Sequence, residues 1–136
     1  MFPLFYIFAS IFHMYKNTYV KTRRLMDEPI NIFKALSDAT RLKIIWLLTN
    51  MDEKICVSEI VEVLNEYQYN VSRHLKILKH AKLVEEVKEG KWVYYYLTPI
   101  KNEFRQLIQE AIKTIPESQM NNEIQKCKKL LAERHK

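Results

Sequence analysis

The chain has 136 residues, of which 48% are hydrophobic and 28% are charged, and its formal net charge is +6. This length suits one domain with a modest core. A single glycine, Gly90, argues against enzymes whose glycine-rich loops hold phosphates, since those loops need two or three glycines within a few residues. Two cysteines, Cys56 and Cys127, make no disulfide framework and predict a reducing, cytoplasmic setting.

The positive charge is concentrated near the N-terminus. Residues 1–25 hold four bases and no acid, so residues 26–136 hold 18 bases against 16 acids. If the protein binds a polyanion, the local arrangement of its charges must provide the affinity, because the bulk charge of residues 26–136 is small.

Residues 1–25 begin with the uncharged run MFPLFYIFASIFHMY. A transmembrane helix needs about 20 apolar residues, and this run is shorter than that. The run also lacks the charged start of a secretory signal. Three interpretations are open: a mis-assigned start with Met26 as the true first residue, an extra helix that packs on the domain or its dimer partner, or a short membrane-surface anchor with a basic flank. We expect no stable membrane association of the whole protein.

Helical signals follow in chain order from Pro29. A first short helix is predicted from an apolar stripe, and Ser37 and Asp38 are suited to cap the helix after it. The segment RLKIIWLLT predicts that second helix, SEIVEVL predicts a third helix of two turns, and residues 68–81 predict a fourth. The stripe of the first helix consists of Ile30, Phe33 and Leu36.

The third and fourth predicted helices are joined by only three residues, Asn65-Glu66-Tyr67. Two short helices with so tight a turn are typical of a helix-turn-helix. Asn65 stands where the turn needs a left-handed backbone, which asparagine adopts more readily than any residue but glycine.

Strand signals replace the helical pattern from Leu83 onward. Two β-rich runs flank Lys88-Glu89-Gly90-Lys91, which predicts a two-stranded hairpin with its turn at Gly90. The helical period then returns in two apolar stripes, one within Phe104–Ile112 and one within Met120–Leu131. The predicted fold class is α+β and mainly helical, with four helices, a hairpin and two further helices.

The fourth helix has one apolar side and one polar side without any carboxylate. Asparagine, serine and arginine read base edges in the major groove and lysine suits phosphate, whereas an ordinary solvated face mixes Glu with Lys. This side therefore predicts DNA recognition. His74 lies at the edge of the buried side and is expected to be packed and hydrogen-bonded. The polar side consists of Tyr69, Asn70, Ser72, Arg73, Lys76 and His80.

The blocks FKALSDATRLKII, CVSEIVEVL and QYNVSRHLKILKHAKLVEEVKEGKWVYYYL resemble, in this order, the ArsR/SmtB family of bacterial winged helix-turn-helix repressors. The resemblance covers residues 30–97. It implies a homodimer that binds an inverted-repeat operator in double-stranded DNA and releases it when an effector binds. Two recognition helices would then enter successive major grooves.

The resemblance also assigns residues to roles. The family's recognition-helix contacts fall on Gln68, Tyr69, Asn70, Ser72 and Arg73, and its wing falls on residues 88–92. With Lys76 on the same face and Lys88 and Lys91 at the hairpin tip, these are the predicted DNA-binding residues. The chain departs from the family at Tyr67 and Tyr69, where small hydroxyl residues are usual, so the helix cap is weaker and a bulky ring faces the DNA.

The implied organisation has three parts. Residues 1–25 are an apolar and basic extension, residues 26–98 are the winged helix-turn-helix DNA-binding domain, and residues 99–136 are C-terminal helices for dimerisation. The first helix would share in the dimer contact.

The effector is less clearly implied. Arsenic- and cadmium-type members carry Cys-Val-Cys before the turn, whereas this chain has Cys56-Val57-Ser58, so one thiolate of a metalloid site is absent. The zinc-type site is missing too, because KNEFRQLIQEAIK has no histidine. Cys56 and Cys127 leave three options: a thiol switch, a two-thiolate site for As(III) or another thiophilic metal ion, or buried packing. A sensing role is favoured for Cys56.

The sequence therefore predicts a non-catalytic, sequence-specific transcriptional regulator, an effector-released dimeric repressor in the cytoplasm. The rival interpretation is a winged-helix protein-interaction module without specific DNA binding. We find no nucleophile and base at a spacing that indicates an enzyme.

Overall fold

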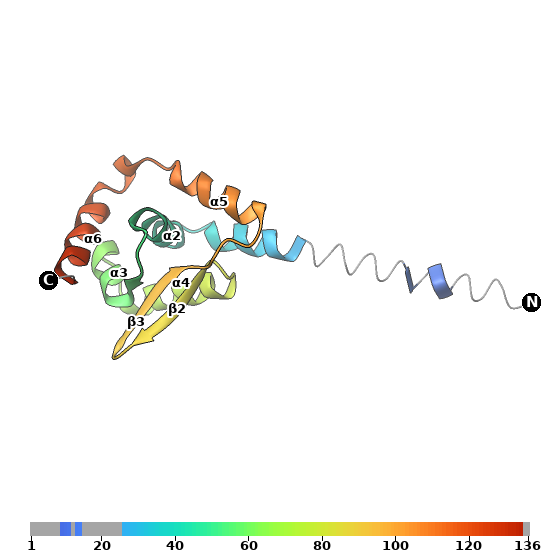
Figure 1. The fold of residues 1–136 in the computed structure, drawn as a ribbon, viewed down its shortest axis with the longest axis horizontal. Coiled ribbons are helices and arrows are strands. Elements are labelled where there is room, and N and C mark those ends of the chain that lie inside the picture. Colours follow the sequence, from blue (N-terminus) through green and yellow to red (C-terminus); the bar gives the residue numbers. More distant parts are fainter. Residues whose placement is uncertain (1–8, 12, 15–25, 135–136) are drawn as a thin grey trace, which may run out of the picture.

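The computed structural model describes residues 9–11, 13–14 and 26–134. Residues 26–36 are helical and precede a mainly helical domain with one small sheet (Figure 1). Its elements are α2 (Ala39–Met51), β1 (Ile55–Cys56), α3 (Val57–Leu64), α4 (Gln68–His80), β2 (Val84–Glu89), β3 (Trp92–Leu97), α5 (Glu103–Lys113), the 3-10 turn η1 (Glu117–Gln119) and α6 (Asn121–Arg134). Within the described residues, no helix combines the length and the apolar character needed to cross a membrane.

Two local signals in the sequence are confirmed where helices begin and end. Asp38 is the N-cap of α2, and its carboxylate accepts the Arg41 N–H at 3.0 Å. Asn65 ends α3 with φ 52° and ψ 46°, the left-handed conformation expected for the tight turn. The helix-turn-helix of α3 and α4 is therefore present as predicted.

The sheet has three antiparallel strands in the order β1-β3-β2, where a two-stranded hairpin was predicted. The hairpin itself is confirmed, with Glu89 opposite Trp92 and Gly90 at φ +60° in the turn. The missed strand, β1, has only two residues and pairs Cys56 with Tyr94. Through this pairing with β3, it connects the start of α3 to the hairpin.

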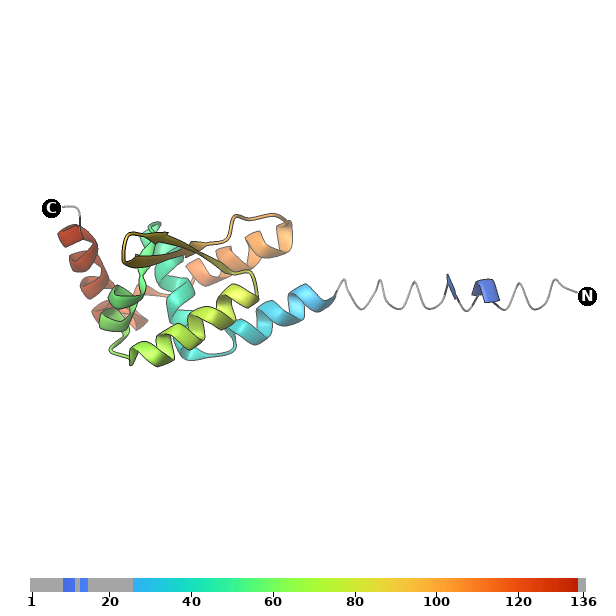
Figure 2. The same ribbon diagram turned by 90° about the horizontal axis from the view of Figure 1, so that it is seen from below.

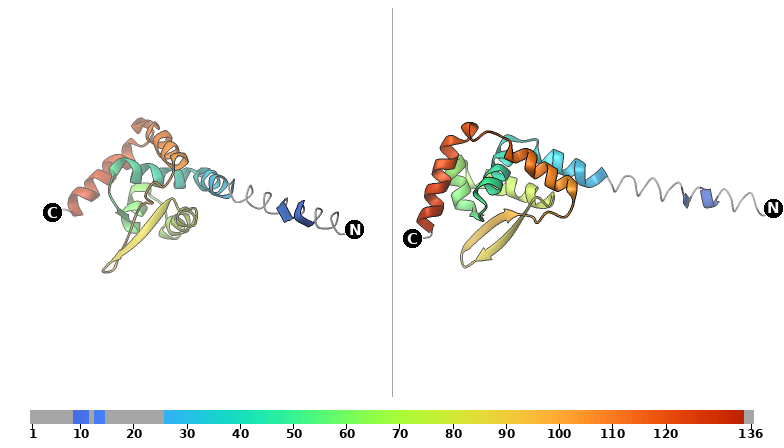
Figure 3. Two further views of the ribbon diagram at one scale, coloured as in Figure 1. Left: turned by 45° about the vertical axis from the view of Figure 1, so that its right-hand side comes forward. Right: turned by 45° about the horizontal axis from the view of Figure 1, so that its top comes forward.

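The core surrounds α2, whose residues 44–49 are all buried. Trp46 is 1% exposed, and its Nε1–H donates to the Ile115 carbonyl at 3.1 Å, which fixes the segment after α5 against α2. The hairpin and α4 lie on one side of this core and α5 lies on the other (Figures 1 and 3).

Helix α6 packs against α3 of its own chain, at the end of the molecule opposite residues 26–36 (Figure 2). Its apolar stripe is buried there, and the Lys43 ammonium pairs with Glu123 at 3.0 Å. The sequence had led us to expect this stripe at a dimer interface, and in the single chain it packs against α3. The buried residues are Met120, Ile124, Cys127 and Leu131.

Candidate DNA-binding surface

The polar face of α4 is open to solvent. Gln68, Tyr69, Ser72, Arg73 and Lys76 are all exposed, and α4 contains no acidic residue. The ring of Tyr67, at the N-cap, is also exposed and forms no side-chain cap bond. The surface therefore combines cationic and hydrogen-bonding groups that have no carboxylate on their own helix.

Asn70 differs from its predicted neighbours. It is half-buried, and its Nδ2 lies at the 3.5 Å limit of a hydrogen bond to the Glu66 carboxylate, across the turn between α3 and α4. Asn70 thus helps to hold the turn that presents the open face. The helical spacing placed it outward, but the neighbouring turn covers part of it.

The buried side of α4 fixes its position. Val71, Leu75 and Leu78 are 0% exposed. Their complete burial means that α4 packs on the core in one orientation, because rotating the helix would place polar side chains in the core and apolar ones in solvent. The exposed face is therefore presented by a rigidly packed helix.

His74 adds a polar contact between α4 and α2 to this packing. The side chain is buried as expected, and its Nδ1 lies 3.3 Å from Arg41 Nη1 and 3.7 Å from the Asp38 carboxylate. The Arg41 Nε–H also donates to the Ala35 carbonyl at the end of helix 26–36. The hydrogen bond from the Arg41 N–H lowers the pKa of Asp38, so its carboxylate is ionised at neutral pH. One arginine thus connects helix 26–36, α2 and α4, a role the sequence did not reveal.

The hairpin tip carries two exposed lysines, Lys88 and Lys91. Lys91 Nζ lies 5.0 Å from the ring centre of Trp92, a side chain that is 45% exposed. A cation over an indole face is favourable and holds the charge near the tip.

The three carboxylates of β2, which would weaken a cationic wing, are each engaged within the chain. Glu85 accepts the Tyr96 hydroxyl at 3.0 Å, and Glu89 pairs with Lys54. Glu86 accepts from the Tyr95 hydroxyl at 2.7 Å and from Lys79 at 2.6 Å. The Lys79 contact also connects the end of α4 to the hairpin.

The candidate sensor residues lie beside the α3–α6 interface. Cys56 is the N-cap of α3, 5% exposed, with Sγ 3.0 Å from the Ser58 hydroxyl oxygen. Cys127 is 1% exposed on α6, and its burial, reinforced by the Glu59 carboxylate, raises the pKa of its thiol to about 11. Cys127 is therefore protonated at neutral pH, which suits packing better than reactivity.

Glu59 and Arg134 join the same region, and neither was singled out in the sequence. Glu59 accepts the Cys56 N–H at 2.8 Å and the Arg134 Nε–H at 3.0 Å. Burial would raise the pKa of Glu59, but these hydrogen bonds outweigh it and hold the pKa below its ordinary value. In the part of the chain that the structure covers, no group of three His, Cys, Asp or Glu residues is arranged to hold a metal ion.

Comparison with known proteins agrees with this geometry. The family model for the bacterial regulatory protein arsR family matches residues 38–86, which run from the α2 cap into β2. The arsenical resistance operon repressor of Escherichia coli is 44% identical over 71 residues, or 52% of this chain and 60% of that protein. The match thus spans about three fifths of that repressor's length.

Two further relatives cover more of the fold. An uncharacterized HTH-type transcriptional regulator from Methanocaldococcus jannaschii is 37% identical over 91 residues, or 67% of this chain and 94% of that protein. The homodimeric winged helix-turn-helix DNA-binding domain of a Mycobacterium bovis protein has a TM-score of 0.59 at 25% identity, covering 70% of this chain and 83% of that one. These relatives confirm the prediction of a regulator rather than an enzyme. The chain belongs to the ArsR family of bacterial regulatory proteins and carries a winged helix-turn-helix.

Proposed function

We propose that this protein is a dimeric transcriptional repressor that binds an operator through α4 and the hairpin and acts in the cytoplasm. The observation that carries the proposal is the open face of α4, which is cationic and free of acidic residues. Gln68, Tyr69, Asn70, Ser72 and Arg73 are assigned to the major groove. Phosphate contacts are assigned to Lys76 on α4 and to Lys88 and Lys91 on the wing.

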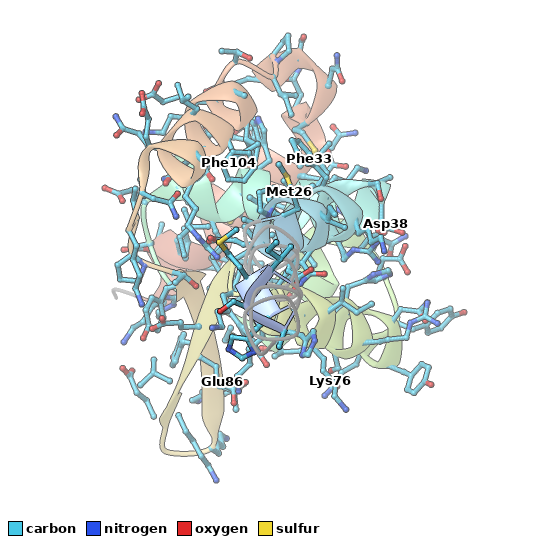
Figure 4. All side chains as sticks on the ribbon, turned by 90° about the vertical axis from the view of Figure 1, so that its right-hand side faces the viewer. Met26, Phe33, Asp38, Lys76, Glu86 and Phe104 are labelled. Atoms are coloured by element: carbon cyan, nitrogen blue, oxygen red, sulfur yellow. The ribbon has the colours of Figure 1, made fainter. Side chains whose placement is uncertain are left out.

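An exposed apolar surface supports dimerisation. Phe33 on helix 26–36 is 57% exposed, and its ring meets that of Phe104 on α5 edge-on at 5.7 Å between centroids (Figure 4). Ile30 and Leu107 on the same two helices are 46% and 56% exposed. We define these four residues as the apolar patch and propose that a second copy covers it, because large exposed apolar patches mark interaction sites.

The stripe of Ile30 and Phe33 therefore serves the partner, while Ile32 and Ala35 of the same helix are buried in the core. In this proposal residues 26–98 bind DNA, α5 and helix 26–36 form the dimer contact, and α6 stabilises α3. Most of residues 1–25 lie outside the described residues, so their three interpretations stay open. In such a dimer the two α4 helices would have to lie roughly 34 Å apart to enter successive major grooves.

Removing a cation from α4 is expected to weaken operator binding. Arg73→Ala should cost at least about 1 kcal/mol, or about fivefold in affinity, through a lost base contact. Lys76→Ala should weaken binding to all duplexes and reduce its salt dependence by about one ion. Fluorescence anisotropy on a promoter duplex measures both effects.

The matched control is Lys128→Ala, which removes the same charge from the exposed face of α6. Wild-type affinity is expected for that variant. Equal losses for Lys76→Ala and Lys128→Ala would mean that overall charge, rather than α4, drives binding. Binding that is absent altogether would favour the protein-interaction module.

We further propose that the effector acts at Cys56 and that it is a thiophilic species such as As(III). Two observations support this: Cys56 occupies the cap that joins β1 to α3, and the E. coli relative is an arsenical resistance operon repressor. A ligand on this thiol would disturb the hydrogen bond between the Cys56 N–H and Glu59, and with it the start of the helix-turn-helix. Cys127, buried with a raised pKa, is assigned to packing rather than to ligand binding.

Ser58→Cys is expected to sharpen the response to arsenite. The Ser58 oxygen already lies 3.0 Å from Cys56 Sγ, so a thiol at residue 58 would give As(III) a second ligand. The arsenite concentration that releases half of the bound duplex should fall at least about tenfold, equivalent to about 1.4 kcal/mol. Anisotropy of the preformed complex during arsenite titration gives this concentration.

Ser118→Cys, which adds a thiol to the exposed η1 turn, is the control and should respond as wild type. The decisive comparison is Cys56→Ser. If arsenite releases this variant as readily as wild type, Cys56 is not the sensor.

A further inference from the structure

Two tyrosine rings stand almost fully in solvent at the start of α4. Tyr67 at the N-cap is 81% exposed, and Tyr69 two residues later is 76% exposed. These are the two highest values among the exposed large apolar side chains of the described residues. They lie on the DNA-binding helix and away from the apolar patch. Rings of this size gain free energy when a partner buries them.

The surroundings of the two rings identify the partner as DNA. Gln68 stands between them in the chain, and Ser72, Arg73 and Lys76 follow on the open face. Their charge and hydrogen-bonding groups complement phosphates and base edges. A recognition helix enters the major groove with its N-terminal residues nearest the bases. In that arrangement the start of α4, which carries Tyr67 and Tyr69, would lie nearest the bases.

The major groove offers one apolar group to such rings, the 5-methyl group of thymine. A phenol ring gives apolar area to that methyl, and its two side-chain torsions lose little entropy on binding. The side chain of Tyr67 makes no hydrogen bond that caps α4, so its ring is available for a contact outside the helix.

We propose that Tyr67 and Tyr69 select operator half-sites by packing on thymine methyl groups beneath the start of α4. This inference rests on the proposed function, since it needs α4 to enter the major groove. It adds Tyr67 to the DNA contacts and states what its ring and that of Tyr69 recognise.

The test begins with wild-type full-length protein and selection from a pool of random duplexes. The selected half-sites should contain thymine at fixed positions. Replacing those thymines by uracil removes only the methyl groups and should weaken binding about fourfold per methyl, the factor that corresponds to about 0.8 kcal/mol. Tyr67→Ala and Tyr69→Ala should lose this discrimination between thymine and uracil.

Tyr67→Phe and Tyr69→Phe keep the rings without the hydroxyls and should discriminate as wild type does. Equal wild-type affinity for thymine and uracil duplexes would overturn the inference while leaving the proposed repressor intact. So would phenylalanine variants that lose as much affinity as the alanine variants, since the hydroxyls would then make the contact. A pool with no enriched sequence would overturn the proposed function itself.

Discussion

Leu107→Glu is expected to convert the protein to a monomer and to weaken operator binding at least about 100-fold. Leu107 is 56% exposed on α5 and is part of the apolar patch. In a dimer the new carboxylate would be buried without a partner, which costs about 3 kcal/mol or more. A monomer also binds only one half-site, so it loses the affinity that a dimer gains from binding two half-sites at once.

Sedimentation equilibrium gives the mass in solution, and anisotropy on the same samples gives the affinity. Gln125→Glu adds the same charge to the exposed face of α6, which is outside the apolar patch, and should remain a dimer with wild-type binding. A Leu107→Glu variant that stays dimeric and binds normally would place the dimer contact elsewhere.

Trp46→Ala is expected to reduce the free energy of unfolding by about 3–5 kcal/mol, the range for removing a fully buried large aromatic side chain. Trp46 is 1% exposed, and its indole holds the segment after α5 through the hydrogen bond to the Ile115 carbonyl. The total free energy of unfolding of a domain of this size is about 5–15 kcal/mol, so the variant would be close to unfolding.

Urea denaturation followed by far-ultraviolet circular dichroism measures this loss, at one fixed protein concentration because a dimer's stability depends on it. Trp46→Phe retains an aromatic ring but removes the indole N–H donor. Its free energy of unfolding should fall by less, about 1–3 kcal/mol. If Trp46→Ala unfolds at the wild-type urea concentration, the indole does not anchor the core.

Local signals carried the sequence-based prediction furthest. Asp38 as a cap, Asn65 as a left-handed residue and the helical spacing of α4 each depend on residues within a few positions, and all three are found in the structure. The buried His74 was predicted for the same reason, from its angle on the helix.

Long-range contacts were missed because the sequence pattern does not record them. β1 has two residues and is defined only by its pairing with Tyr94 and Tyr95. The contacts of Arg41 with His74 and of Arg134 with Glu59 join side chains 33 and 75 residues apart. Amphipathic stripes that pack within a chain and stripes that face a partner look alike in sequence, so the packing of α6 against α3 was not predicted.

Binding of the full-length protein to a duplex from its own promoter and to a scrambled duplex, measured by anisotropy at two salt concentrations, shows whether the protein reads an operator. We predict that the promoter duplex binds at least about 1,000-fold more tightly and that both affinities fall as salt rises, because α4 and the wing contact phosphates as well as bases. Equal affinity for the two duplexes, or binding that is indifferent to salt, would contradict a repressor that reads its operator through α4.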